Sequence, residues 1–236
     1  MGFTGRISNK LFLLKIILLI LFLNWQIYLI FIYKHPTLDV EVYPNTNPSP
    51  PIIKGVSLGQ TFLAKRNGLA KIEVMMGTYG RENNRDIEFS LWELRPNKKL
   101  VRKIIVNARR IRNNLYNEFK FKPISDSQGK MFYFQFSSPD STKDNAVCCW
   151  LNNKNIYSNG QFILNGAQQK ADIVFRIYAQ RPIIQELRTL VKNNSEIMGN
   201  YWALVIGIIF FELIQIVAFI WLLNWLFSFI PSRVLP

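Results

Sequence analysis

Two long apolar runs near the ends of the chain constrain its fold more than any other feature. The first, LFLLKIILLILFLNWQIYLIFIY (residues 11–33), contains one charge, Lys15. The second, YWALVIGIIFFELIQIVAFIWLLNWLFSFI (residues 201–230), also contains one, Glu212. A helix of about 20 apolar residues crosses the hydrocarbon core of a bilayer. Each run therefore predicts a transmembrane helix, and the chain is predicted to cross the membrane twice.

The flanks of the first run predict the topology. This run is longer than the apolar core of a signal peptide, and the sequence KHPTLDV that follows it lacks a small-residue cleavage site, so we expect the helix to be retained. Arg6 and Lys10 precede it, and basic flanks stay in the cytoplasm. The flank 1–10 and the tail 231–236 are therefore predicted to be cytoplasmic. The residues between the spans are predicted to be periplasmic or extracellular, anchored in the cell (inner) membrane.

Between the two runs, apolar and polar residues alternate in short stretches separated by Gly, Pro, Asn and Asp. In KIEVMM, for example, Ile72, Val74 and Met76 fall on one face of a strand. The predicted strands are 56–64, 71–76, 86–94, 100–108, 116–122, 130–137, 146–151, 161–164 and 172–178. No helical pattern separates them, which predicts an all-β, antiparallel, jelly-roll-like β-sandwich over residues 55–180. The sandwich is flanked by the N- and C-terminal transmembrane helices.

The stretch GQTFLAKRNGLAKIEVMMGTYGR (residues 59–81) contains four glycines, which raises the question of whether it forms a nucleotide-binding loop. A dinucleotide fingerprint needs a strand, a Gly-rich turn and then a helix whose N-terminus binds the phosphates. Here Gly59 and Gly68 flank strands. The glycines are therefore interpreted as turn residues of a β-domain.

Two segments connect the predicted sandwich to the helices. Residues 34–54 include PNTNPSPP (44–51), and proline-rich segments favour extended, stiff geometry, so we expect a spacer there. Residues 181–200 are expected to form an amphipathic helical connector, which either lies on the membrane or docks on the sandwich. Its apolar positions at helical spacing are Ile183, Ile184, Leu187, Leu190 and Val191.

Few residues offer catalytic chemistry, and we expect no enzyme, no cofactor and no metal. His35 is the one histidine, which excludes His-based triads and zinc clusters. Two-carboxylate glycoside hydrolysis stays open by residue type, although no pair has a distinctive spacing. Asp172 is expected to bond a neighbouring loop, with a calcium ligand as the alternative. Cys148 and Cys149 are interpreted as small apolar strand residues, with a redox pair as the alternative.

The loop TYGRENNR (residues 78–85) offers an aromatic ring and two guanidinium groups beside a strand. Sugar-binding sandwiches present exposed aromatic rings with Asn, Arg or Asp at the rim. The alternative interpretation is a solvated loop and core aromatics. The candidate ligand-binding residues are Tyr79, Arg81, Asn83, Asn84, Trp92 and Trp150.

The chain carries a formal net charge of +14, with 24 Lys and Arg against 14 Asp and Glu between residues 36 and 198. A basic domain attracts anionic lipid headgroups, acidic polysaccharides or teichoic-type polymers. Nucleic acid is not expected as a partner outside the cytoplasm. The charge alone selects no ligand among these.

Polar residues inside the apolar runs indicate helix packing, because polar groups in a bilayer normally face a partner helix. Glu212 and Gln215 in the second run are expected to face Asn24 and Gln26 in the first, or another membrane protein. Two spans rarely form a transport path alone. A homo-oligomer or a larger complex is therefore expected.

The strand sequences also carry a resemblance. The stretches GQTFLAKRNGLAKIEVMMGTYGRENNRDIEFSLWEL, NEFKFKPISDSQGKMFYFQFS and ADIVFRIYA resemble an extracytoplasmic β-sandwich domain of bacterial membrane proteins associated with surface-polysaccharide handling. The resemblance covers residues 55–180 and implies a jelly-roll with carbohydrate-binding-module character. The function expected from it is a non-catalytic module that binds glycan or a partner protein. The alternative is a structural accessory subunit of a membrane complex with no small ligand.

Overall fold

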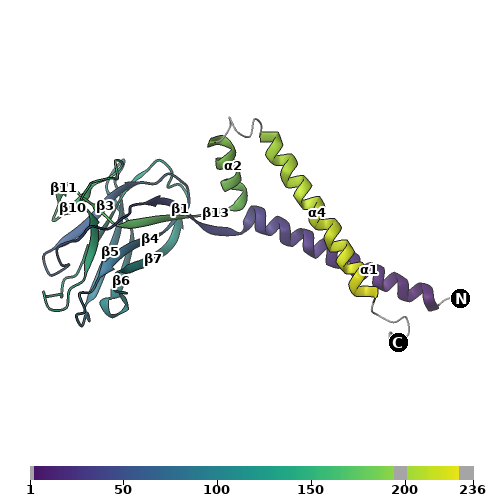
Figure 1. Ribbon diagram of the computed structural model, residues 1–236, viewed down its shortest axis with the longest axis horizontal. Helices are drawn as coiled ribbons and strands as arrows, with labels where there is room; N and C mark the ends of the chain where they lie inside the picture. The colour runs from purple at the N-terminus through teal and green to yellow at the C-terminus, as the bar shows by residue number, and fades with distance from the viewer. Residues whose placement is uncertain (1–2, 194–200, 229–236) are drawn as a thin grey trace. The chain divides into compact units, whose positions relative to one another are not determined.

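The computed structural model describes residues 3–193 and 201–228. The chain divides into two compact units, one formed by residues 1–35 together with 182–236 and one formed by residues 36–181. The first unit holds the helices and the second holds the strands (Figure 1). The predicted division into helices near both ends and a central β-domain is confirmed.

The helical unit contains two helices that could each span a membrane. Its elements are α1 (Phe3–Ile27), a π-helical turn η1 (Tyr28–Ile32), α2 (Ile183–Asn193) and α4 (Tyr201–Ser228). The stretches Phe12–Ile32 and Ile206–Ser228 have mean hydropathies of 2.2 and 2.5. Almost none of their side chains is buried, so neither resembles the buried core helix of a soluble domain.

The two long helices contact each other inside this unit (Figure 1). The rings of Phe22 in α1 and Phe219 in α4 stack with centroids 4.3 Å apart. Lys15 donates a hydrogen bond of 2.8 Å to Asn224. Helix α2 contacts η1. The predicted connector over 181–200 thus contains a helix over 183–193, and residues 194–200 lie outside the described residues.

The β-domain is a sandwich of two antiparallel sheets (Figure 1). The seven-stranded sheet has the order β1-β13-β4-β9-β12, with β7 paired to β4 and β2 paired to β9. Its strands are β1 (Lys34–Glu41), β2 (Asn47–Pro48), β4 (Leu69–Gly77), β7 (Leu115–Ile124), β9 (Cys148–Asn152), β12 (Asp172–Ile173) and β13 (Phe175–Pro182). The predicted all-β sandwich flanked by two apolar helices is confirmed.

The six-stranded sheet has the order β11-β10-β3-β8-β5-β6. Its strands are β3 (Ser57–Leu63), β5 (Asp86–Glu93), β6 (Lys99–Asn107), β8 (Met131–Ser137), β10 (Phe162–Leu164) and β11 (Ala167–Gln169). A single turn of 3-10 helix, η2 (Ala108–Arg110), follows β6. Phenylalanines from both sheets fill the space between them, because aromatic side chains supply large apolar area. The fully buried ones are Phe62, Phe89, Phe119, Phe132, Phe134, Phe136 and Phe175.

The structure differs from the predicted spacer over residues 34–54. Strand β1 pairs with β13, and β2 pairs with β9. Val40, Val42 and Ile52 are buried in the core of the sandwich. Pro36 in β1 and Pro48 in β2 fit because both are edge strands, where one side of the backbone needs no hydrogen-bond donor. The segment is therefore part of the sandwich, which begins before residue 55.

The strand register defines two ends of the sandwich. Ala179 near the end of β13 pairs with Leu69 at the start of β4, and Val42 after β1 bonds to Phe175. The end where β1 begins and β13 finishes therefore holds the start of β4. Gly77, at the other end of β4, lies at what we call the distal end. The loops after β4 and before β7 both lie there, because Leu115 pairs with Met76.

Candidate functional site

The outer face of the seven-stranded sheet carries a group of aromatic side chains. Alternation along each strand puts core residues such as Val74, Phe119 and Ile177 on the inner face and their neighbours on the outer face. Five aromatic residues thereby come to one side of the sheet or its rim. We call this set the aromatic platform: Tyr43, Tyr79, Tyr116, Trp150 and Tyr178.

Cationic side chains lie over three rings of the aromatic platform, and two of these contacts join different strands. The Nζ of Lys71 in β4 is 3.9 Å from the centroid of Tyr178 in β13. The guanidinium of Arg176 reaches across β4 to within 4.0 Å of the centroid of Tyr116 in β7. Arg176 also forms an ion pair of 2.6 Å with Glu41. These cation–π contacts link three strands into one surface.

The same face holds a partly desolvated charge network beneath the rings. Lys71 pairs with Glu73 at 2.5 Å and with Glu118 at 3.4 Å. Only 14% of the Lys71 side chain and 8% of the Glu73 side chain are exposed. A hydrogen bond from Lys120 lowers the pKa of Glu118. Paired charges shielded from water hold long side chains in place, so the side chains of this face have a fixed arrangement.

The distal end of the platform is built around Gly77. Trp150 donates from Nε1 to Oδ1 of Asn114 at 3.0 Å, and a hydrogen bond joins Tyr79 and Cys148. A Cβ added at Gly77 would lie 3.1 Å from Sγ of Cys148 and 3.6 Å from Nε1 of Trp150. The absence of a side chain at position 77 leaves space for this cluster.

The exposure of the rings suits contact with a ligand. Tyr43 is 59% exposed and Tyr79 is 49% exposed, while Tyr116 is partly buried. The buried hydroxyl of Tyr116 has no hydrogen-bond partner among the described residues. Burial raises the pKa of Tyr116, Arg176 opposes this rise, and Glu41 and Tyr43 add to it. Burial and the hydrogen bond with Cys148 raise the pKa of Tyr79 to about 12. Both phenols are therefore neutral near pH 7 and can donate hydrogen bonds.

The structure brings together three of the predicted ligand residues. Tyr79, Arg81 and Trp150 lie at the distal end of the platform, and the guanidinium of Arg81 is 4.8 Å from the centroid of Tyr79. Asn84 is exposed in the same loop, and its backbone oxygen accepts from Asn107. Asn83 has a different role from the one predicted. It is buried and donates to the backbone oxygens of residues 145 and 146, which fixes the loop.

Trp92 lies on the other sheet, apart from the platform. It pairs with Tyr133 across β5 and β8, and the Nζ of Lys98 lies 4.9 Å from its centroid. The strand register puts it six residues from the distal start of β5, or about 20 Å along the strand. At the distal end of that sheet, Ser57, Glu88 and Ser137 line an open cavity of about 350 Å³.

The residues considered for other chemistry have structural roles. Among the described residues no group of three or more His, Cys, Asp and Glu could hold a metal ion. The carboxylate of Asp172 accepts from Gln60 at 3.0 Å and from the backbone of Tyr157 at 2.8 Å, as expected for loop bonding. Cys148 and Cys149 are free thiols buried in β9, and burial raises the pKa of both. This disfavours the thiolate form that redox chemistry uses.

The polar residues of the helices are only partly brought together. Gln26 donates a hydrogen bond to Gln215 between α1 and α4. Asn24 instead donates to Ile20 in its own helix at 2.8 Å. Glu212 is partly exposed and forms no ion pair or hydrogen bond with the residues that the structure describes.

Sequence reasoning did not select Tyr43, Tyr116, Tyr178 or Arg176 as site residues. The available signal was the i, i+2 spacing of Arg176 with Tyr178 and of Tyr116 with Glu118 on the faces opposite core residues. No protein-family model matches the chain, and no curated protein is significantly similar to it. The resemblance to carbohydrate-binding modules stays a prediction.

Proposed function

We propose that this chain is a non-catalytic, membrane-anchored module that binds a glycan on the aromatic platform. The helices hold the chain in the cell membrane, and the sandwich faces the periplasm or the cell exterior. Its role lies in the handling of envelope polysaccharide. One observation carries the proposal, namely the group of partly exposed rings on the outer face of the seven-stranded sheet.

The chemistry of the platform fits a sugar polymer. A sugar ring has an apolar C–H face, which stacks on flat aromatic side chains, and hydroxyls at its rim, which need hydrogen-bonding groups. The ring of Tyr43, which is 59% exposed, and the ring of Trp150 supply the flat surfaces. Arg176 and Glu41, whose side chains are both partly exposed, supply a donor and an acceptor beside them. Strand β4 extends the surface from Lys71 to Gly77, about 20 Å, which suits a chain of sugars.

The test is glycan-array binding of the full chain in phosphatidylcholine nanodiscs, followed by titration calorimetry on any ligand found. Tyr43→Ala and Trp150→Ala are each expected to weaken binding about fivefold, since an aromatic stacking contact contributes roughly 1 kcal/mol. Trp92→Ala, on the other sheet, is the matched control and is expected to bind as the wild type does. Equal losses for all three variants, or no glycan bound at all, would refute the proposal.

A second candidate is a structural accessory subunit of a larger membrane complex. It is favoured by Glu212, which is without a bonding partner among the described residues and lies within an apolar span. Such a group normally faces a partner helix. A native mass well above that of the monomer in mild detergent, reduced by Glu212→Leu, would support this role.

A further inference from the structure

Five arginines gather at the distal end of the sandwich, in the two loops that border the aromatic platform. The loops span residues 78–85, between β4 and β5, and residues 108–114, between β6 and β7. We call them the arginine loops; all five arginines are exposed, and among the described residues none forms an ion pair. Glu82 is the one carboxylate within these loops. The arginines are Arg81, Arg85, Arg109, Arg110 and Arg112.

Asparagine side chains lock the backbones of the arginine loops together. Asn107 donates to the oxygen of Asn84 at 3.1 Å and to Oδ1 of Asp86 at 2.9 Å. The backbone of Thr78 donates to Oδ1 of Asn113 at 2.8 Å. The amide of residue 108 donates to the oxygen of residue 85 at 2.9 Å. Asn83 ties the first loop to the loop before β9. The backbone that carries the arginines is therefore held in place without using their charges.

The guanidinium groups are largely unused within the protein. Arg112 donates to the backbone oxygen of Tyr116 at 2.8 Å, and Arg81 lies over the ring of Tyr79. Among the described residues, the guanidinium groups of Arg85, Arg109 and Arg110 form no hydrogen bond and no ion pair. A fixed backbone that presents free guanidinium groups is suited to bind carboxylate or phosphate by paired, charge-assisted hydrogen bonds.

We infer that the glycan of this module is anionic and that the arginine loops bind its carboxylate or phosphate groups. This inference rests on the proposed function. The loops border the platform through Tyr79 and Arg81 and through Asn114, which accepts a hydrogen bond from Trp150, so a polymer on the rings would continue over the arginines. This continuity favours a charged polysaccharide over a lipid headgroup, which would use the arginines without the aromatic rings.

The test compares polygalacturonate with its methyl ester, which keeps the backbone and removes the charge, and includes polyglycerol phosphate as the phosphate probe. The full chain in phosphatidylcholine nanodiscs is expected to bind at least one anionic polymer. The triple variant Arg85→Gln/Arg109→Gln/Arg110→Gln is expected to lose about tenfold in affinity, since each exposed charge contact contributes roughly a factor of two. Added salt should weaken the binding of the wild type more than that of the variant.

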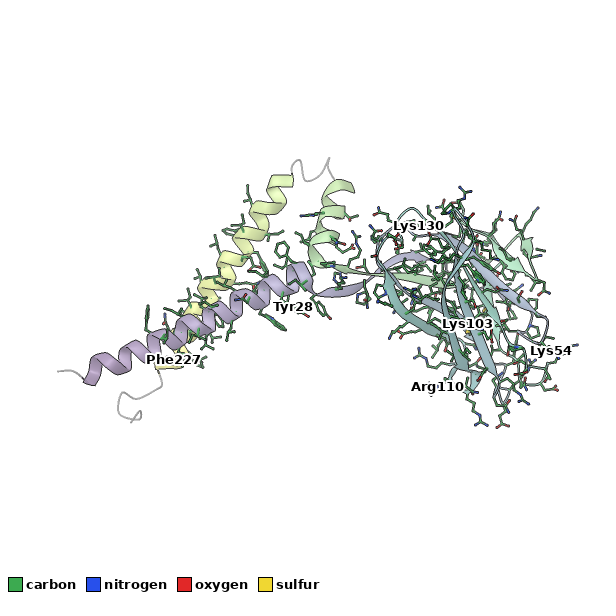
Figure 2. All side chains as sticks on the ribbon, turned by 180° about the vertical axis from the view of Figure 1, so that it is seen from behind. Tyr28, Lys54, Lys103, Arg110, Lys130 and Phe227 are labelled. Atoms are coloured by element: carbon green, nitrogen blue, oxygen red, sulfur yellow. The ribbon has the colours of Figure 1, made fainter. Side chains whose placement is uncertain are left out.

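A matched control removes the same charge from the other end of the sandwich. It replaces three exposed lysines: Lys65→Gln, Lys99→Gln and Lys122→Gln. Figure 2 shows Arg110 and Lys130 well apart on the sandwich, and Lys130 lies next to the start of β8 at the end away from the arginine loops. The control is expected to bind within about twofold of the wild type. Equal losses for the two triple variants would mean that only net charge matters, and the inference would fail.

The outcomes separate this inference from the proposed function. Equal binding of the polymer and its methyl ester, with sensitivity to Trp150→Ala, would overturn the inference and leave the proposed function intact. Binding of anionic polymers that depends on the arginines but not on Trp150 would overturn the platform proposal. Capture of phosphatidylglycerol vesicles by the chain held in phosphatidylcholine nanodiscs, lost in the arginine triple variant and without any polysaccharide binding, would assign the arginine loops to lipid and overturn the inference.

Discussion

Replacing Gln60 by leucine tests how the two sheets of the sandwich are joined. Gln60 in β3 belongs to one sheet and Asp172 in β12 to the other, and both are fully buried. The Gln60 side chain donates to the Asp172 carboxylate at 3.0 Å and accepts from the backbone of Ile173 at 3.0 Å. Leucine keeps the approximate volume but leaves a buried N–H and a carboxylate oxygen without these partners.

The expected cost follows from these two groups. An unsatisfied buried polar group costs about 1–3 kcal/mol, so two such groups cost roughly 2–6 kcal/mol, partly offset by the apolar side chain. We expect the substitution to lower the free energy of unfolding by about 3 kcal/mol. For a domain of this size this corresponds to a fall in Tm of roughly 10 °C. The assay is thermal unfolding of the full chain in detergent, monitored by tryptophan fluorescence.

The destabilisation caused by Gln60→Leu should depend on pH, and the environment of Asp172 determines whether it increases or decreases as the pH rises. Burial raises the pKa of Asp172 above 3.8, and bonds from Tyr157 and Gln60 oppose the rise. A carboxyl with a raised folded pKa contributes stability that is fully present below pH 3.8 and is lost as the pH rises through the raised value. Gln60→Leu removes one opposing bond, so its penalty should be larger at pH 7 than at pH 4.

Gln135→Leu is the matched control, because the Gln135 side chain lies on the outer face of β8 and forms no hydrogen bond among the described residues. It should change stability by less than about 0.5 kcal/mol. A Tm for Gln60→Leu within 2–3 °C of the wild type, roughly 1 kcal/mol, would refute the reasoning. A penalty that is the same at pH 4 and pH 7 would refute the assigned role of Asp172.

Three further predictions concern other parts of the chain. Gly160→Ala should destabilise the sandwich by about 1–3 kcal/mol in thermal unfolding, since its Cβ would lie 1.9 Å from a backbone oxygen of β3; an unchanged Tm would contradict this. Cys148 and Cys149 should react with a thiol reagent only after denaturation, because both are buried and have raised pKa values; rapid labelling of the folded chain would disagree. Gln26→Leu and Gln215→Leu should be non-additive in detergent unfolding by about 0.6 kcal/mol, and strict additivity would argue against their hydrogen bond.

The strands of the sandwich could largely be predicted from the sequence, because one buried face imposes a period of two. The register of β4, with Ile72 and Val74 in the core, follows directly from the alternation in KIEVMM. Strands β1 and β2 were missed because their prolines indicate a spacer by composition alone. The tolerance of edge strands for proline depends on the neighbouring strand, which local sequence does not show.

The candidate site could be predicted only where it lies within one loop. Tyr79 and Arg81 are close in sequence, and their contact is local. Arg176 over Tyr116 joins strands about 60 residues apart, and it depends on the strand order of the sheet. Asn83 lies in the same loop, but its burial could not be predicted. The local sequence does not distinguish an asparagine that faces solvent from one that is buried and bonds a neighbouring loop.

The pairing of β1 with β13 has a mechanical consequence. The first and last strands of the sandwich are neighbours, and both connect to the rest of the chain from the same end of the sheet. Tension between the two connections would break the hydrogen bonds between β1 and β13 one after another, starting at that end. Strand β13 would stay paired with β4. The same closeness makes residues 36–181 a cassette that can be spliced into a surface turn of a host protein, because its two ends need only a short gap.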